Sequence, residues 1–143
     1  MQTSILERLV VLHEKPLHSA GMSQWIGLQI RPGIEPAIAV ARSRNGTPAG
    51  GVYLSAHGAA PFIEEACRLA RESRGGVAGL VRVRDGVHVE IASTRVVTRG
   101  AASAVIVLTL IAPDGERRRP TVLKDHVEIA ALDAAAFIAT ETH

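Results

Sequence analysis

Residues 52–63 resemble residues 127–138 without a gap, 75 positions further along the chain. The identical pairs are Val52/Val127, Ala56/Ala131, Ala59/Ala134, Ala60/Ala135, Phe62/Phe137 and Ile63/Ile138. Each copy is typical of a strand that runs into a helix, and each closes a half of about 70 residues. The match therefore predicts a duplicated α+β unit, with one repeat in residues 1–75 and the other in 76–143, folded together as one compact pseudo-dimer. It also predicts that Phe62 and Phe137 occupy equivalent, buried positions.

The second half has the clearer pattern of strands. Apolar residues alternate through 80–84 and 87–97, and Asp85-Gly86 between them is a hairpin turn signal. Residues 104–112 are continuously apolar, as in a central strand buried on both faces. A return arm is expected to run to about Ile129, and Asp133 is a plausible cap for a last helix over residues 134–141.

The first half fits the same order. Residues 24–31 alternate as a strand, Asn45-Gly46 is a turn signal, and residues 51–54 form a further strand. A helix is expected from near Ala60 until Gly75-Gly76. Residues 4–15 carry a capping-box pattern at Ser4, yet their apolar run equally suits a strand. The predicted fold class is thus α+β, with two tandem ββββα-like repeats and antiparallel sheets.

This order of elements, with the duplicated segment, resembles the Whirly-like group of single-stranded nucleic-acid binders, which includes the PUR-repeat proteins. The resemblance implies two repeats packed within one chain, with sheets that curve outward. It implies single-stranded DNA or RNA as the partner. Those binders commonly stack bases on exposed aromatics, whereas Phe62 and Phe137 here lie in predicted helices, where packing explains them.

The residues themselves offer candidates for such an interface. Arg makes up 14 of the 16 basic residues, and many lie at two-residue steps on predicted strands, where they could follow a phosphate backbone. Trp25 and Tyr53 could stack on bases from strands. The expected nucleic-acid-binding residues are Arg42, Arg44, Arg82, Arg84, Arg95, Arg117, Arg118, Arg119, Trp25 and Tyr53.

Each of these features also has a structural explanation. The arginines could simply keep a sheet face solvated through cross-strand pairs, such as Arg82 or Arg84 with Glu90. The two aromatics could belong to the core or to an interface. A protein-interaction or small-ligand-binding module with no nucleic-acid role is therefore the alternative function. The surface distribution of the strand-borne arginines separates the two, because nucleic acid requires them to converge into one stripe.

Other functions receive less support from the sequence. Cys67 has no surrounding catalytic motif, and no histidine has the spacing of a metal site. We therefore expect a protein that is not an enzyme, with no metal and no cofactor. With one cysteine, no apolar run long enough to span a membrane and no secretory signal pattern, a cytoplasmic location is expected. A homodimer is compatible with this layout.

Overall fold

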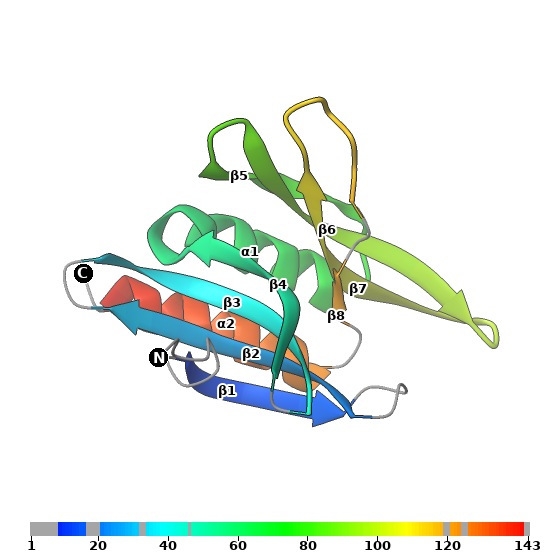
Figure 1. Cartoon of the computed structure of the whole chain (residues 1–143). Helices are drawn as coiled ribbons and strands as arrows, with labels where there is room; N and C mark the ends of the chain where they lie inside the picture. Colours follow the sequence, from blue (N-terminus) through cyan, green and yellow to red (C-terminus); the bar gives the residue numbers. More distant parts are fainter. Residues whose placement is uncertain are drawn as a thin grey trace.

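The computed structural model describes residues 9–16, 21–31, 34–45, 47–118, 121–123 and 126–141. Over these residues the fold is α+β, as predicted, with two four-stranded antiparallel sheets and two helices (Figure 1). The elements follow one another as β1 (Leu9–Pro16), β2 (Met22–Arg31), β3 (Ile34–Arg44), β4 (Thr47–Ser55), α1 (Ala56–Arg71), β5 (Gly76–Arg84), β6 (Val87–Thr98), β7 (Ala101–Ile111), β8 (Thr121–Leu123) and α2 (His126–Glu141).

Both sheets are meanders in which each strand pairs with the next one along the chain. Tight turns with positive φ make these hairpins: Asn45 has φ 50° and Gly86 has φ 73°. Both sites had been predicted from their turn residues, although Gly46 itself lies outside the described residues. Of the two alternatives for residues 4–15, the described part from Leu9 onward is a strand, and the capping-box residues lie outside the description.

Each sheet turns one apolar face toward the helices. In the first sheet the alternation of strand residues buries Ile26 and Leu28 on β2 and brings them opposite Val40 and Ile38 on β3. In the second sheet the corresponding buried residues are Val89, Ile91, Ile106 and Leu108. With the small residues of the helices, these side chains form one continuous core.

The helices cross over between the halves. Helix α1, which follows the first sheet, makes most of its sheet contacts with β5, β6 and β7 of the second. Helix α2, which follows the second sheet, contacts β1, β2 and β3 of the first, and the two helices pack side by side (Figure 1). Each apolar sheet face is therefore covered largely by the helix of the other half.

The end of the chain differs from its prediction. The return strand β8 ends at Leu123, and α2 begins at His126 rather than near 134, so residues 127–138 lie wholly in a helix. Residues 52–63, in contrast, run from β4 into α1. The prediction that both segments run from strand into helix is therefore wrong for the second one. Phe137 is 64% exposed, which also contradicts its predicted burial, whereas Phe62 packs against the core.

Both helices begin earlier in the chain than predicted. Helix α1 begins at Ala56 rather than near Ala60, because Ser55 caps it: its Oγ accepts a hydrogen bond from the Gly58 N–H at 3.3 Å. Asp133 does not cap a helix but lies within α2, where it accepts a hydrogen bond from Arg71 of α1 at 2.7 Å. Both helices are thus longer at their N-terminal ends than their sequences suggested.

The buried faces of the two helices do match, in a different register. A shift of 69 positions takes the buried residues of α1 onto those of α2, for example Ala59 to Glu128, Ile63 to Leu132 and Ala66 to Ala135. The ungapped shift of 75 places Phe62 on the exposed Phe137 instead. The two halves share their order of elements, and the duplication itself stays a prediction.

Candidate nucleic-acid interface

The predicted arginines of the first sheet lie on its helix-covered face. Arg42 of β3 stands opposite Gln24, and Arg44 stands opposite Met22. Since residues directly opposite each other share a face, both arginines lie on the side from which Gln24 reaches α2. Arg44 is exposed and its Nε lies 3.4 Å from Met22 Sδ, while Arg42 Nε is buried without a hydrogen-bond partner among the described residues.

Trp25 and Tyr53 lie on the opposite face of the same sheet. Trp25 stands opposite Ala41, and Tyr53 opposite Ala39, on the strands next to them. Both rings are half-buried; the Trp25 Nε1–H donates to Ser43 Oγ at 2.8 Å, and burial raises the pKa of Tyr53. The structure therefore does not bring the two aromatics together with Arg42 and Arg44 on one face.

Three of the predicted arginines in the second half of the chain pair with acids, namely Arg82, Arg117 and Arg118. Arg82 pairs with Asp85 in the β5–β6 turn, and Arg118 NH1 lies 3.4 Å from Glu116 Oε1. Arg117 donates two hydrogen bonds, at 3.1 and 2.8 Å, to the carboxylate of Glu90. This guanidinium lowers the pKa of Glu90. Among the described side chains, Glu90 thus pairs with Arg117 rather than with Arg82.

Two further predicted residues cannot be placed in an interface. Arg84 belongs to β5, but its side chain lies outside the description, as does the whole of Arg119.

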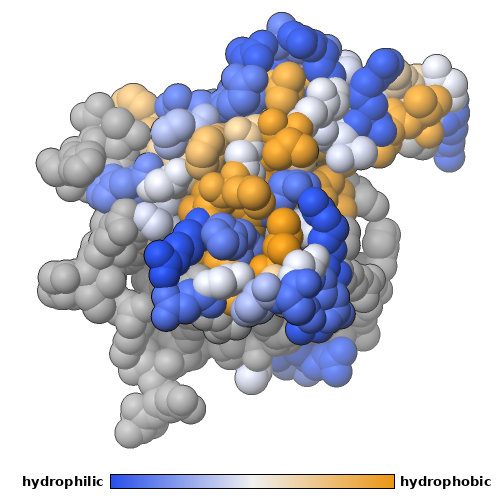
Figure 2. All heavy atoms as spheres, turned by 90° about the horizontal axis from the view of Figure 1, so that it is seen from above, coloured by the Kyte–Doolittle hydropathy of each residue, from blue (hydrophilic) through white to orange (hydrophobic). Residues whose placement is uncertain are grey.

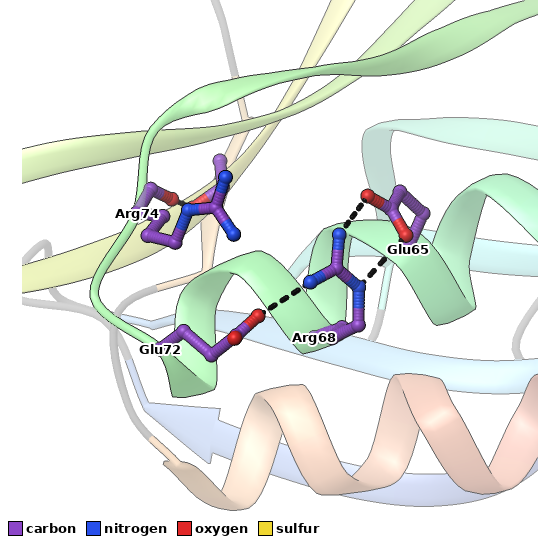
Figure 3. Close-up of polar contacts among 5 residues, drawn as sticks. Glu65, Arg68, Glu72 and Arg74 are labelled. Atoms are coloured by element: carbon purple, nitrogen blue, oxygen red, sulfur yellow. Dashed lines mark hydrogen bonds and ion pairs between the residues drawn. The ribbon is translucent and has the colours of Figure 1, made fainter.

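The exposed face of α1 shows the same balance of charge. Arg68 lies between two acids of its own helix (Figure 3), donating to Glu65 Oε2 at 3.0 Å and to Glu72 Oε2 at 2.6 Å. These contacts raise the pKa of Arg68 and lower that of Glu65. Arg71 pairs with Asp133 of α2. These helix arginines are therefore already matched by carboxylates.

Arg95 is the predicted residue that stands apart from this pattern. Strand β5 accompanies β6 only as far as Ser93, and β8 accompanies β7 only from Ile106 onward. Residues 94–98 and 101–105 therefore pair only with each other among the described strands. This segment, Thr94–Val105, is called the β6–β7 ribbon below, and it projects from the body of the molecule (Figure 1).

The β6–β7 ribbon carries a second arginine that was not among the predicted site residues. Arg99 and Gly100 form its tight turn, with φ of 54° and 79°. Both Arg95 and Arg99 are exposed, and Val97 between them is 72% exposed. The Arg-Gly pair between two apolar runs is the sequence signal that could have identified this turn.

The described residues offer few groups that could take part in catalysis. Burial raises the pKa of the Cys67 thiol to about 12, and its Sγ lies 3.8 Å from the Ile129 carbonyl oxygen, to which it can donate. Within the same part of the chain, no group of three His, Cys, Asp or Glu side chains is placed to hold a metal ion. No described helix is long and apolar enough to cross a membrane.

A buried polar cluster lies where α2 meets the first sheet. The carboxylate of Glu128 is fully buried, and its Oε1 lies 2.7 Å from Lys15 Nζ of β1 and 2.9 Å from Gln24 Nε2 of β2. These contacts join three elements, so the cluster fixes the position of α2 on the sheet.

Comparison of this chain with family models, curated proteins and solved structures finds no match in any of the three.

Proposed function

We propose that this protein binds nucleic acid without acting as an enzyme, and that the β6–β7 ribbon is its principal contact. The observation that carries the proposal is the charge of the ribbon: it holds Arg95 and Arg99 and has no acidic residue between positions 94 and 105. The described arginines Arg82, Arg117 and Arg118 of the body pair with carboxylates. No ion pair joins Arg95 or Arg99 to an acid among the described residues, so a phosphate would meet positive charge at the ribbon.

A single strand is the expected ligand. Two guanidiniums on a short ribbon cannot follow the two phosphate rows of a duplex, whereas a flexible strand can bend to reach both of them. Neutralising about two phosphates of a single strand predicts a slope of about −1.4 in a plot of log affinity against log salt concentration. Arg44, exposed on the first sheet, would add to this slope only if the strand also reaches that face.

Fluorescence anisotropy with a short labelled oligonucleotide at low salt tests the proposal. Replacing Arg95 and Arg99 together by Ala should weaken binding and flatten the salt slope, because two phosphate contacts are lost. Arg118→Ala removes an exposed arginine that is paired with Glu116 on the body, and it should leave both quantities nearly unchanged. Equal losses in the two variants would place binding on the body instead, and no binding at tens of micromolar protein would refute the proposal.

A second candidate is a protein-interaction module, which is supported by apolar side chains on β5. Val77 is 64% exposed and Leu80 is 52% exposed, and both share the outer face of the second sheet with Ala92 and Glu90. Seen from above, hydrophobic groups gather in the middle of the molecule with hydrophilic groups around them (Figure 2). Such exposed patches often mark protein contacts.

The two candidates respond differently to mutation. If β5 is the functional surface, replacing Val77 and Leu80 by Ser should lower the binding of an apolar fluorescent probe such as ANS and leave oligonucleotide binding unchanged. If oligonucleotide binding falls with the probe signal, the two surfaces are not independent, which would contradict the assignment of nucleic acid to the ribbon.

A further inference from the structure

Among the described residues, no strand pairs with the outer side of β7 along the β6–β7 ribbon. Residues 101–105 of β7 pair with β6 on one side, and on the other side the described part of β8 reaches only Ile106, Val107 and Leu108. A two-stranded ribbon is marginally stable in water, and an unpaired edge presents backbone groups that can take up another strand. The outer edge of β7 can therefore accept a partner strand.

The ladder shows which residues face outward. The turn at Arg99 and Gly100 joins Thr98 directly to Ala101, and in such a two-residue hairpin the flanking pair exchanges both hydrogen bonds. Because hydrogen-bonded pairs alternate along an antiparallel ladder, Ala102 and Ala104 direct their N–H and C=O groups away from β6. By the same alternation, Ile106 and Leu108 direct their N–H and C=O groups toward β8, the strand that pairs with them.

We propose that this edge pairs with the same edge of a second copy, antiparallel, with a two-fold axis at or next to Ala102. The residues of the edge, Ala101 to Val105, are small or β-branched, carry no charge and include no proline. Strand addition to another protein gains its specificity from side-chain pockets, which these residues do not form. A two-fold axis needs only that the edge match itself, and small uncharged side chains do so without clash or repulsion.

The pairing would also enlarge the nucleic-acid surface, a consequence that rests on the function proposed above. Arg95 stands opposite Ala104, so its side chain shares a face with the side chains of Ala102 and Ala104. A two-fold axis perpendicular to the sheet keeps the same face of both ribbons on one side. Arg95 from both copies would then lie on one four-stranded surface, with an Arg99 turn at each end. Four cations instead of two would steepen the salt slope to about −2.8.

Substitutions that introduce a positive or a negative charge at Ala102 test the pairing without any nucleic acid. The mass of the wild-type chain is measured by size-exclusion chromatography with light scattering, from micromolar to millimolar concentration. We expect the wild type and Ala102→Ser to shift reversibly toward dimer. Ala102→Lys and Ala102→Glu alone should stay monomeric, because like charges meet at the axis, and an equimolar mixture of the two should recover the dimer.

The outcomes separate this inference from the proposed function. A wild-type chain that remains monomeric at the highest concentration would overturn it, as would a dimer that Ala102→Lys leaves intact while circular dichroism shows a native fold. A dimer that forms without oligonucleotide binding would support the pairing and refute only the proposed function. Monomeric protein that binds the oligonucleotide with a salt slope near −1.4 would refute the pairing and support the proposed function.

Discussion

Replacing Lys15 by Met should destabilise the protein through Glu128. The Glu128 side chain is fully buried, and Lys15 supplies the ammonium 2.7 Å from its Oε1. Without that ammonium, the hydrogen bond from Gln24 remains, but the buried carboxylate loses the cation that pairs with its Oε1. Breaking a buried ion pair typically costs 3–5 kcal/mol. Because the Lys15 side chain is 24% exposed and water can replace part of its effect, we expect about 3 kcal/mol.

That loss would be a large part of the stability of a chain this size, since domains unfold with about 5–15 kcal/mol. Urea unfolding followed by circular dichroism measures it directly, and the melting temperature should fall by roughly 6–12 °C. Adding Glu128→Gln to Lys15→Met should recover most of the loss, because the amide keeps a partner for Gln24 and carries no charge. Arg68→Met, which breaks two exposed ion pairs on α1, serves as the matched control and should change the unfolding curve little.

Two results would refute this reasoning. A cost below about 1 kcal/mol for Lys15→Met would mean that Glu128 does not depend on its ammonium partner. Failure of the added Glu128→Gln to restore stability would show that the loss arises from the packing of the Lys15 side chain rather than from the removal of its ammonium charge.

The remaining predictions concern the core and its thiol. Phe62→Ala should cost about 2 kcal/mol or more, since the ring packs against the core, whereas Phe137→Ala should change the unfolding free energy by less than about 0.5 kcal/mol; equal costs in urea unfolding would contradict the environments described. Gly79→Ala should destabilise by about 1–3 kcal/mol, because an added Cβ would overlap the Phe62 ring, and Phe62→Leu in the same chain should relieve part of that. The pKa of Cys67 is raised from 9.0 to about 12, so its contribution to stability is fully present below pH 9 and is lost as pH rises toward 12, by up to about 1.4 kcal/mol per pH unit; a Cys67→Ala chain with the same alkaline loss in melting temperature would rule out the thiol as its cause.

Local patterns identified most of the strands. The turn at Asp85-Gly86 follows from turn residues that accept positive φ, and the alternating strand β2 follows from the period of two. The continuous apolar run of residues 104–112 indicated most of β7. The fold class followed from the order of these elements. Such signals succeed where one face of a strand is apolar throughout and the competing helical pattern is absent.

The prediction of where α2 starts was wrong for a reason that is visible in three residues. Val127, Glu128 and Ile129 alternate apolar, acidic and apolar, which is typical of a strand with its acid in solvent. The structure reverses this assignment: Val127 is 57% exposed and Glu128 is fully buried with Lys15 and Gln24. A buried charge depends on partners more than a hundred residues away in the chain, so no local window contains the information that makes it possible.

The candidate site could not be read from spacing for a related reason. Arg82 and Arg95 look alike in the sequence, since both lie on predicted strands of one hairpin. Only the extent of β5 distinguishes them. Asp85, directly after β5, pairs with Arg82, whereas the pairing of β5 with β6 reaches Ser93 and not Arg95. Beyond that point the β6–β7 ribbon adds Ala104 to the core, while residues 99–103 at its tip are exposed. Its exposed Val97 and its two arginines are therefore not explained by folding, and this is the physical reason for placing the function there.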